Sequence, residues 1–454
     1  MPNVVIVRSD EHDPSISSVY GHPFVKTPNL ERLAKKGTTY GSAYCASPLC
    51  CPSRSAFMSG LHVHEIQVYN NGLPFRPEVP SYGDVLRQHG VYTAYFGKLD
   101  SYNAPTALGF SEMHGKDVRG PGKTVIARQP EVAIREGSSN RQKGHDVHPF
   151  VFSLDLGRMR SALGWLKRRG RNLSERDMDF VLEVNLSKPH FPHHVTRKYW
   201  KMYEGHADLP DSKYGPDTEP GQHPYSLDLK RHFQTGQFTE EHIRKLRRGY
   251  YGCVSFVDHQ LGRIINALED YGLMDDTILA YTTDHGEMLG RYGMWWKCSL
   301  LEPSARIPLI IAGPGFKKGQ HNSTAVEQHD LLATMFSALG KKFPTNWHGV
   351  PLQDIKSNDP EKLAFCEYHG HGTRASAFMV RKGAWKYIHN SAPDAPHQLF
   401  DLASTEGELA NQYDNKIEIA EEMELNLRGI CDPDKENLRA TQRIAQQLEI
   451  IAKH

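Results

Sequence analysis

Short, strongly apolar runs alternate along this chain with longer segments whose apolar residues recur every three or four positions. Runs that are apolar without interruption are typical of strands covered on both faces. They occur at residues 4–7, 92–96, 180–186, 277–282 and 307–311. Helical spacing occurs between them, at residues 29–36, 81–89, 240–271 and 329–339. This alternation predicts an α/β fold with a large mixed, mostly parallel sheet flanked by helices.

The pattern changes from about residue 348. Short alternating runs at residues 364–368, 377–381, 385–389 and 398–402 predict antiparallel strands, and residues 436–453 predict a helical tail. We therefore expect a catalytic domain over residues 1–347 and a smaller C-terminal subdomain, antiparallel sheet plus helix, over residues 348–454. The polar excursions at residues 115–148 and 205–237 are expected to be surface insertions, which often shape substrate sites.

Composition narrows the class of protein. A chain of 454 residues that is 39% hydrophobic can bury a substantial core. Its mean hydropathy is −0.57 and no apolar run is long enough to span a bilayer, so we expect no membrane partner. A net charge of +1 gives no field that would recruit nucleic acid. The first apolar run follows Met1 without a charged leader, so cytoplasm is the expected location unless a leader has been removed.

The cysteines add one further expectation. The seven cysteines are scattered and form neither a disulfide framework nor a zinc pattern, so reduced thiols are expected. Two of them, however, are adjacent and stand directly before a proline. That pair belongs to the most informative motif of the chain.

The motif is Cys50-Cys51-Pro52-Ser53-Arg54, and it resembles the signature of the formylglycine-dependent sulfatases. The resemblance implies the alkaline-phosphatase-like α/β architecture and a formylglycine-generating enzyme as maturation partner. In that family the first cysteine, here Cys50, is oxidised to formylglycine, whose hydrated aldehyde is the nucleophile. A serine would be trapped as a stable sulfate ester, whereas the second hydroxyl of the hydrate lets the aldehyde re-form and expel sulfate.

Two pairs of residues that could bind a metal stand at predicted strand ends. Asp10 and Glu11 follow the first predicted strand, and Asp284 and His285 follow the fourth. Carboxylate oxygens in such positions suit a hard divalent cation, Ca²⁺ or Mg²⁺. In sulfatases the corresponding pairs and the formylglycine oxygen hold one Ca²⁺. The resemblance therefore implies a metal site made by Asp10, Glu11, Cys50, Asp284 and His285, although the family more often has Asp, Asn or Gln at position 11.

Cationic and acid-base residues complete the expected catalytic site. Arg54 lies one turn from Cys50 at a predicted helix N-terminus, where backbone N–H groups and a guanidinium can hold an anion. The resemblance implies that Arg54 steadies the formylglycine hydrate and that Lys98 and Lys297 bind sulfate oxygens. It also implies that His190 protonates the leaving alkoxide, a task that suits the proton affinity of histidine. Fixed cations and a metal offset the charge that develops as the S–O bond breaks.

One position departs from the usual sulfatase motif. Asp100 stands where the common Gly-Lys-Trp-His sequence has a histidine that helps to deprotonate the formylglycine. The base for sulfate release is therefore unassigned, and His64 is a candidate. Both residues are expected to lie near the substrate.

Several motifs narrow the resemblance within the family. Residues 47–54, 97–100, 284–288 and 367–370 look like the branch that contains arylsulfatase K and its bacterial relatives. Members of that branch remove the 2-O-sulfate of glucuronate in glycosaminoglycans, so the expected substrate is a sulfated saccharide. By analogy, His369 and Arg374 are expected to bind a uronate carboxylate.

Other functions remain open. Choline or aryl sulfatases and phosphonate monoester or phosphodiester hydrolases share much of the framework, including the region of Lys297. A sulfated-glycan-binding protein without turnover is the alternative of another class, if Cys50 is not oxidised or Asp100 has removed the base. An oligomer is compatible with the sequence.

Overall fold

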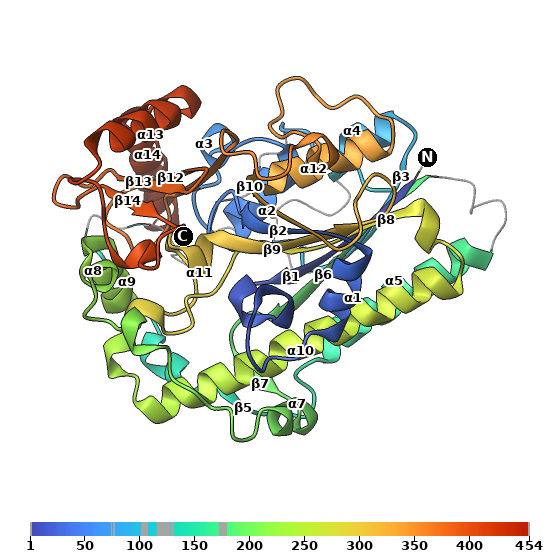
Figure 1. Cartoon of the computed structure of the whole chain (residues 1–454), viewed down its shortest axis with the longest axis horizontal. Coiled ribbons are helices and arrows are strands. Elements are labelled where there is room, and N and C mark those ends of the chain that lie inside the picture. The colour runs from blue at the N-terminus through green and yellow to red at the C-terminus, as the bar shows by residue number, and fades with distance from the viewer. Residues whose placement is uncertain are drawn as a thin grey trace.

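An eight-stranded sheet forms the centre of the protein, and helices cover both of its faces (Figure 1). The computed structural model describes residues 2–73, 75, 78–100, 108–115, 128, 131–171 and 179–452. The strand order is β10-β2-β9-β8-β1-β6-β3-β4. Neighbouring strands are parallel except where β9 pairs with β2 and β8. The predicted fold class, a mixed and mostly parallel sheet, is therefore confirmed.

The strands of this sheet are β1 (Asn3–Asp10), β2 (Gly37–Tyr44), β3 (Tyr92–Gly97), β4 (Glu112–His114), β6 (Phe180–Pro189), β8 (Thr277–Thr283), β9 (Arg306–Ala312) and β10 (Gln320–Glu327). Side chains along β1 point alternately to the two faces of the sheet and contribute to the hydrophobic core on each face. Val4 and Ile6 lie in one core, and Val5 and Val7 lie in the other. One face packs on α2 (Cys50–Ser59), α4 (Tyr82–Gln88) and α12 (Gln328–Ala338). The other packs on α1 (Pro28–Lys36), α5 (Ser153–Arg171) and α10 (Glu240–Asp270), which lie together below the sheet in Figure 1.

The apolar runs correctly predicted β1, β3, β6, β8 and β9, and the helical spacing predicted α1, α4, α10 and α12 to within one or two residues. The sequence pattern did not reveal β2 and β10. Strand β2 contains Gly37 and Gly41, which weaken a strand signal. A Cβ at Gly37 would lie 2.0 Å from the Ile311 carbonyl oxygen, so glycine is required for the close approach of β9.

A second sheet follows, with four antiparallel strands: β11 (Leu363–Tyr368), β12 (Ala377–Lys382), β13 (Trp385–Asn390) and β14 (Gln398–Asp401). Helix α13 (Ile417–Ile430) packs on this sheet. Helix α14 (Pro433–Ala452) instead packs near α3 (Val63–Ile66), where Ala440 and Ile444 meet Ile66 and Tyr69. The predicted sheet and helical tail are confirmed, and the domain boundary at residue 348 stays a prediction.

The described parts of the two polar segments, residues 115–148 and 205–237, pack against the rest of the protein. Strand β5 (His145–Val147) pairs in parallel with β7 (His193–Val195). The other short helices are α7 (Arg197–Met202), α8 (Glu219–Gln222), α9 (Pro224–Phe233) and α11 (Glu302–Ala305). Among the described residues, no helix combines the length and the apolarity needed to cross a bilayer.

The parallel strands bring the predicted site residues to one edge of the sheet. Strand β1 ends at Asp10, β3 ends just before Lys98, β6 ends just before His190, and β8 ends just before Asp284. Because β8, β1, β6 and β3 are neighbours running in the same direction, their carboxyl ends form one continuous edge. Open α/β sheets bind ligands at this edge.

Candidate active site

Cys50 lies at the centre of this edge, as the first residue of α2. Its Sγ is 3.2 Å from Nε2 of His285. Ligand atoms of Asp10, Cys50, Asp284 and His285 all lie within 4.8 Å of one another, and all four residues are fully buried. The structure therefore brings together four of the five predicted metal ligands in one compact group.

The hydrogen bonds of this group leave it suited to a cation. Asp10 Oδ1 is buried and has no hydrogen-bond partner within the described part of the chain. His285 Nδ1 lies 3.0 Å from the Gly286 carbonyl oxygen and donates there, so Nε2 faces the group. Burial lowers the pKa of His285, but Asp284 and Cys50 outweigh it and raise that pKa to about 10, so a bound cation would have to displace the Nε2 proton. Asp284 Oδ1 accepts from the backbone N–H groups of Glu11 and His285. An orphaned carboxylate oxygen beside a second carboxylate and an imidazole nitrogen fits a divalent cation.

Glu11, the fifth predicted ligand, lies on the adjacent side of the site. Its Oε2 is 3.2 Å from Lys297 Nζ and 3.3 Å from His190 Nε2. It forms an overlapping group with Asp10 and His190, and its Oε1 is buried without a partner among the described residues. Glu11 therefore belongs to the same centre, and its role as a ligand stays a prediction.

His190 is the most accessible member of the centre, with 23% of its side chain exposed. Its Nδ1 donates to the Phe191 carbonyl oxygen at 2.6 Å, so Nε2 accepts from Lys297. Burial and the charge of Lys297 lower the pKa of His190 well below its usual value. The lowered pKa favours the neutral ring, and the role of His190 as a proton donor stays a prediction.

Arg54 holds the carboxylates in place. Its guanidinium donates to Asp284 Oδ2 at 2.8 Å and to Asp10 Oδ2 at 3.0 Å. It also donates to Asn185 Oδ1 at 2.9 Å and to the Lys98 carbonyl oxygen at 3.1 Å. Burial lowers the pKa of Arg54, but Asp284 and Asp10 outweigh it and raise that pKa well above its usual value. Arg54 therefore binds the carboxylate neighbours of residue 50, and its predicted action on the formylglycine hydrate stays a prediction.

Lys98 and Asp100 form an ion pair next to Asp10. Lys98 Nζ bonds to Asp10 and lies 3.0 Å from Asp100 Oδ2. Asp100 therefore pairs with Lys98 beside the site, and its predicted contact with the substrate stays a prediction. Burial raises the pKa of the Cys50 thiol, yet Lys297 and Lys98 outweigh it and the pKa is lowered. The two lysines together favour negative charge at position 50.

Several residues of the site have strained backbone conformations. Glu11, Asp100, Trp296 and Cys298 have positive φ values of 65°, 49°, 65° and 77°. Each such conformation costs about 1–3 kcal/mol in a non-glycine residue, so it persists only where the surroundings require it. The strained positions include or adjoin site residues, which indicates that the fold fixes the direction of these side chains.

Glu287 fixes the segment that carries Lys297, a role that the sequence did not reveal. Its Oε1 accepts from the backbone N–H of Trp296 at 2.6 Å and of Leu289 at 2.8 Å. Burial and the charge of Glu11 raise the pKa of Glu287 well above its usual value. The only signal in the sequence was its place three residues after Asp284, on the same loop.

The structure does not bring His64, His369 or Arg374 into this centre. His64 Nδ1 and His369 Nε2 bond to the two oxygens of the buried Glu367, at 3.0 and 2.7 Å. His64 follows the C-terminal end of α2, whereas Cys50 starts it, and ten helical residues span about 15 Å. The assignment of His64 as the release base is therefore not supported.

Arg374 is likewise engaged elsewhere. Its guanidinium makes two 2.7 Å bonds to Asp228 and also pairs with Asp394. Among the described residues, no contact of His369 or Arg374 reaches Cys50 or its neighbours. The expectation that these two residues bind a uronate carboxylate is not supported, because both side chains are bonded to carboxylates of the protein itself.

Arg141 is a cation near the site that the sequence did not single out. Its guanidinium carbon lies 4.0 Å from the ring centre of Trp296 and 4.4 Å from that of Phe191. These aromatic residues adjoin Lys297 and His190 in the chain. Arg141 Nε is buried without a hydrogen-bond partner among the described residues, and burial lowers its pKa to about 10. Arg141 lies within a polar excursion, where nothing in the sequence distinguished it from other surface arginines.

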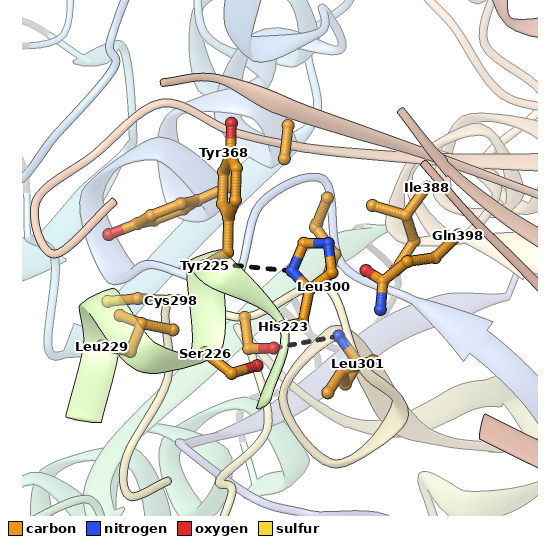
Figure 2. Close-up of a pocket in the computed structure, with 12 residues that line it drawn as sticks. His223, Tyr225, Ser226, Leu229, Cys298, Leu300, Leu301, Tyr368, Ile388 and Gln398 are labelled. Atoms are coloured by element: carbon orange, nitrogen blue, oxygen red, sulfur yellow. Dashed lines mark hydrogen bonds between the residues drawn. The ribbon is translucent and has the colours of Figure 1, made fainter. Parts of the chain in front are cut away.

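A small internal cavity lies behind the segment that carries Lys297. It lies between α9, residues 298–301 and the second sheet, and Figure 2 shows His223, the residue before α9, on the side of Ile388 and Gln398 of that sheet. Its volume of about 30 Å³ is sufficient for a water molecule and far too small for a saccharide. This cavity is therefore not the substrate site.

Comparisons with known proteins agree with this geometry. A family model described as "Sulfatase" matches residues 2–341, and one described as "N-sulphoglucosamine sulphohydrolase, C-terminal" matches residues 290–431. The chain is 32% identical to arylsulfatase K of Homo sapiens over 96% of this chain and 83% of that protein. It is 30% identical to choline-sulfatase of Rhizobium meliloti (strain 1021) over 91% of this chain and 83% of that protein.

Solved structures share the fold. The phosphonate monoester hydrolase of Agrobacterium radiobacter superposes with a TM-score of 0.75 at 22% identity, over 95% of both chains. A 2-O GAG sulfatase superposes with a TM-score of 0.74 at 21% identity, over 97% of this chain and 94% of that chain. The described architecture, including the second sheet, is therefore a known one.

Replacing Arg54 tests its part in holding the site together. We expect Arg54→Met to lower the free energy of unfolding by about 3–5 kcal/mol, because two buried carboxylates lose their shared cation. Urea unfolding measures this difference. Arg160→Met on the exposed face of α5 is the control and is expected to change stability by less than about 0.5 kcal/mol. Equal stability of the two variants would contradict the structural role of Arg54.

Proposed function

The chain belongs to the sulfatase family and is a sulfuric ester hydrolase; from this premise we propose that it removes sulfate from a sulfated saccharide, in the first place the 2-O-sulfate of a uronate. Formylglycine formed from Cys50 and one Ca²⁺ ion are the proposed cofactors. The observation that carries the proposal is the compact group of Asp10, Asp284 and His285 around residue 50. The similarity to arylsulfatase K over nearly the whole chain supports the choice of substrate.

Hydrated formylglycine would supply the nucleophilic oxygen, and a bound divalent cation would polarise the oxygens beside it. Asp10, Asp284 and His285 would hold the cation. A ligand set richer in oxygen than in nitrogen favours Ca²⁺ or Mg²⁺ over thiolate-preferring metals. Arg54 keeps the two carboxylates at a fixed separation, so the site is organised before the substrate arrives.

Lys98 and Lys297 are proposed to bind the sulfate oxygens. Both lower the pKa of the Cys50 thiol, so their charges favour an anion at position 50. Lys98 Nζ contacts Asp10, and Lys297 Nζ contacts Glu11. A tetrahedral anion placed between the lysines would therefore receive charge-assisted hydrogen bonds from two sides.

His190 is proposed to protonate the oxygen that leaves sulfur. Its Nε2 faces Lys297 and is the accessible edge of the centre. An anionic substrate would bind Lys297 and add negative charge beside the ring. Both effects raise the low pKa of His190 and favour the protonated acid form when the substrate is bound.

Arg141, in place of Arg374, is the proposed contact for the uronate carboxylate. Its guanidinium is desolvated, stacks on aromatic rings and adjoins the His190 side of the site. A buried guanidinium that lacks a full set of partners favours a ligand carboxylate. This arrangement supports an acidic sugar over a cationic substrate such as a choline ester.

The first rival is a phosphonate monoester hydrolase. Sulfate monoesters and phosphonate monoesters are both tetrahedral and singly charged, so the same cationic pocket suits either. The second rival is a sulfated-glycan-binding protein without turnover, which requires only that Cys50 stays a thiol. These rivals differ in turnover and in the nature of residue 50.

A substrate comparison tests the proposed activity. We expect kcat/KM for a 2-O-sulfated uronate disaccharide to exceed that for choline sulfate and for a phenyl phosphonate monoester by at least about 100-fold. This ratio corresponds to about 2.8 kcal/mol of differential transition-state binding. Sulfate release and phenol release provide the measurements. A preference for the phosphonate would assign the chain to the first rival.

Residue 50 is tested by two neighbouring substitutions. We expect Cys50→Ala to abolish turnover, because it removes the only precursor of the nucleophile, and Cys51→Ala to leave most of it. Intact mass of the wild-type protein made with a formylglycine-generating enzyme should show H₂S replaced by O at one cysteine. If both variants lose activity equally while folded and matured, the assignment of Cys50 is wrong.

Arg141 is tested by its effect on selectivity. We expect Arg141→Gln to raise KM for the sulfated uronate by about tenfold or more, because a charge-assisted bond of about 1.5–3 kcal/mol is lost. A small aryl sulfate without a carboxylate should be affected little, which makes it the internal control. Arg231→Gln, on the neighbouring helix α9, is the matched control variant. Equal losses on both substrates would show that Arg141 is only structural.

A further inference from the structure

A second cluster of metal-ligating side chains lies at the other end of α2. It consists of His62, Glu327 and His329, whose ligand-capable atoms all lie within 4.8 Å of one another. His62 stands between α2 and α3, Glu327 ends β10, and His329 lies in the first turn of α12. Two segments that are distant in the chain, one with His62 and one with Glu327 and His329, therefore converge on one point, away from the group around Cys50.

The hydrogen bonds of His329 direct a lone pair into this cluster. Its Nε2 lies 3.3 Å from the Ala56 carbonyl oxygen and therefore donates its proton there. Its Nδ1 then carries the lone pair, and it lies 3.4 Å from Glu327 Oε2. A proton on Nδ1 or a bound cation must lie between these two atoms, because a bare lone pair and a carboxylate oxygen repel each other. A ligating histidine that donates its other N–H to a backbone carbonyl is the usual arrangement at metal sites.

His62 adds a ring nitrogen that could bind a metal. The residue is 5% exposed, and its Nδ1 is buried without a hydrogen-bond partner among the described residues. Its ring lies 5.3 Å from that of His329, in an edge arrangement. Burial lowers the pKa of His62 to about 3, so its imidazole is neutral at ordinary pH, which is the form that binds metal.

The cluster is reachable from outside. The side chain of Glu327 is 14% exposed. His348 stacks on His62 at 3.9 Å between ring centres, and 38% of its side chain is exposed. The nearby cation Lys362 is bonded to Asp330 at 2.9 Å. An ion can therefore enter past His348 and Glu327.

We propose that His62, Glu327 and His329 form a second metal site, and that its ion is Zn²⁺. Two neutral imidazoles and one carboxylate are a preferred donor set of zinc, whereas the group around Cys50 is rich in oxygen. The ion would link the C-terminal end of α2 to the start of α12. Because α2 begins at Cys50, this site stabilises the helix that presents the catalytic residue from its far end.

The experiment is a metal titration of the full-length protein that has been stripped of metal and then saturated with Ca²⁺. We expect one equivalent of Zn²⁺ to bind and to raise the melting temperature. Co²⁺ in its place should give the visible bands of a tetrahedral nitrogen and oxygen site. It should give no thiolate charge-transfer band, which binding at Cys50 would produce in unmatured protein.

Substitutions locate the ion. His329→Gln and His62→Gln are each expected to weaken Zn²⁺ binding by more than about 100-fold, since even loss of a supporting hydrogen bond costs about 10–100-fold. His89→Gln, which replaces an exposed histidine elsewhere, should leave binding unchanged. Melting curves without zinc show whether each variant folds, and either cluster variant is sufficient for the test.

Two results would overturn the proposal. Wild-type protein that binds no Zn²⁺ in the presence of Ca²⁺ would leave His329 and Glu327 as a protonated ion pair. Zinc binding that is lost in Asp284→Asn but kept in the cluster variants would place the ion at the group around Cys50. Neither result depends on sulfatase turnover, so the proposed function is tested separately.

Discussion

One buried guanidinium holds the site together. Arg54 donates to Asp10 at the end of β1, to Asp284 after β8, to Asn185 on β6 and to the Lys98 carbonyl after β3. A single side chain thus connects the carboxyl ends of four neighbouring strands. Without it, two fully buried carboxylates would face each other at an edge where water cannot screen them. The parallel sheet can collect acidic residues at this edge because Arg54 neutralises them.

The same edge is prepared for an anion before any ligand arrives. Lys98 and Lys297 stand beside the acidic pair, and together they lower the pKa of the Cys50 thiol despite its burial. Strained backbone at Glu11 and Trp296 fixes where these charges point. Such an arrangement favours a tetrahedral anion, and a phosphonate monoester hydrolase shares the fold. We propose that selectivity comes from groups farther out, such as Arg141 beside Phe191 and Trp296.

Helix α2 is held at both ends. At its start, Cys50 faces His285, and Ser53 donates to the Asp284 carbonyl oxygen at 2.6 Å and bonds to Gln328 of α12. Just beyond its end, His62 meets Glu327 and His329 at the start of the same α12. Residue 50, the proposed nucleophile, therefore sits on a helix that contacts other segments at both of its ends. A rigid support of this kind keeps position 50 within reach of its ligands.

The sequence by itself determined the fold class, the order of the main elements and most of the catalytic centre. Continuous apolar runs identify buried strands, and residues directly after parallel strands must meet at one edge, so Asp10, Lys98, His190 and Asp284 could be placed together. The sequence could not place His64 and Arg374, because their partners Glu367 and Asp228 are distant in the chain. It could not place His369 either, because only the fold shows that its ring turns back to Glu367, two residues earlier. Nor could it reveal Arg141, Glu287 or the cluster at His62, which depend on contacts between segments that carry no periodic signal. Local pattern fixes which elements form, whereas long-range packing decides which polar side chains are already satisfied and which are left to bind a ligand.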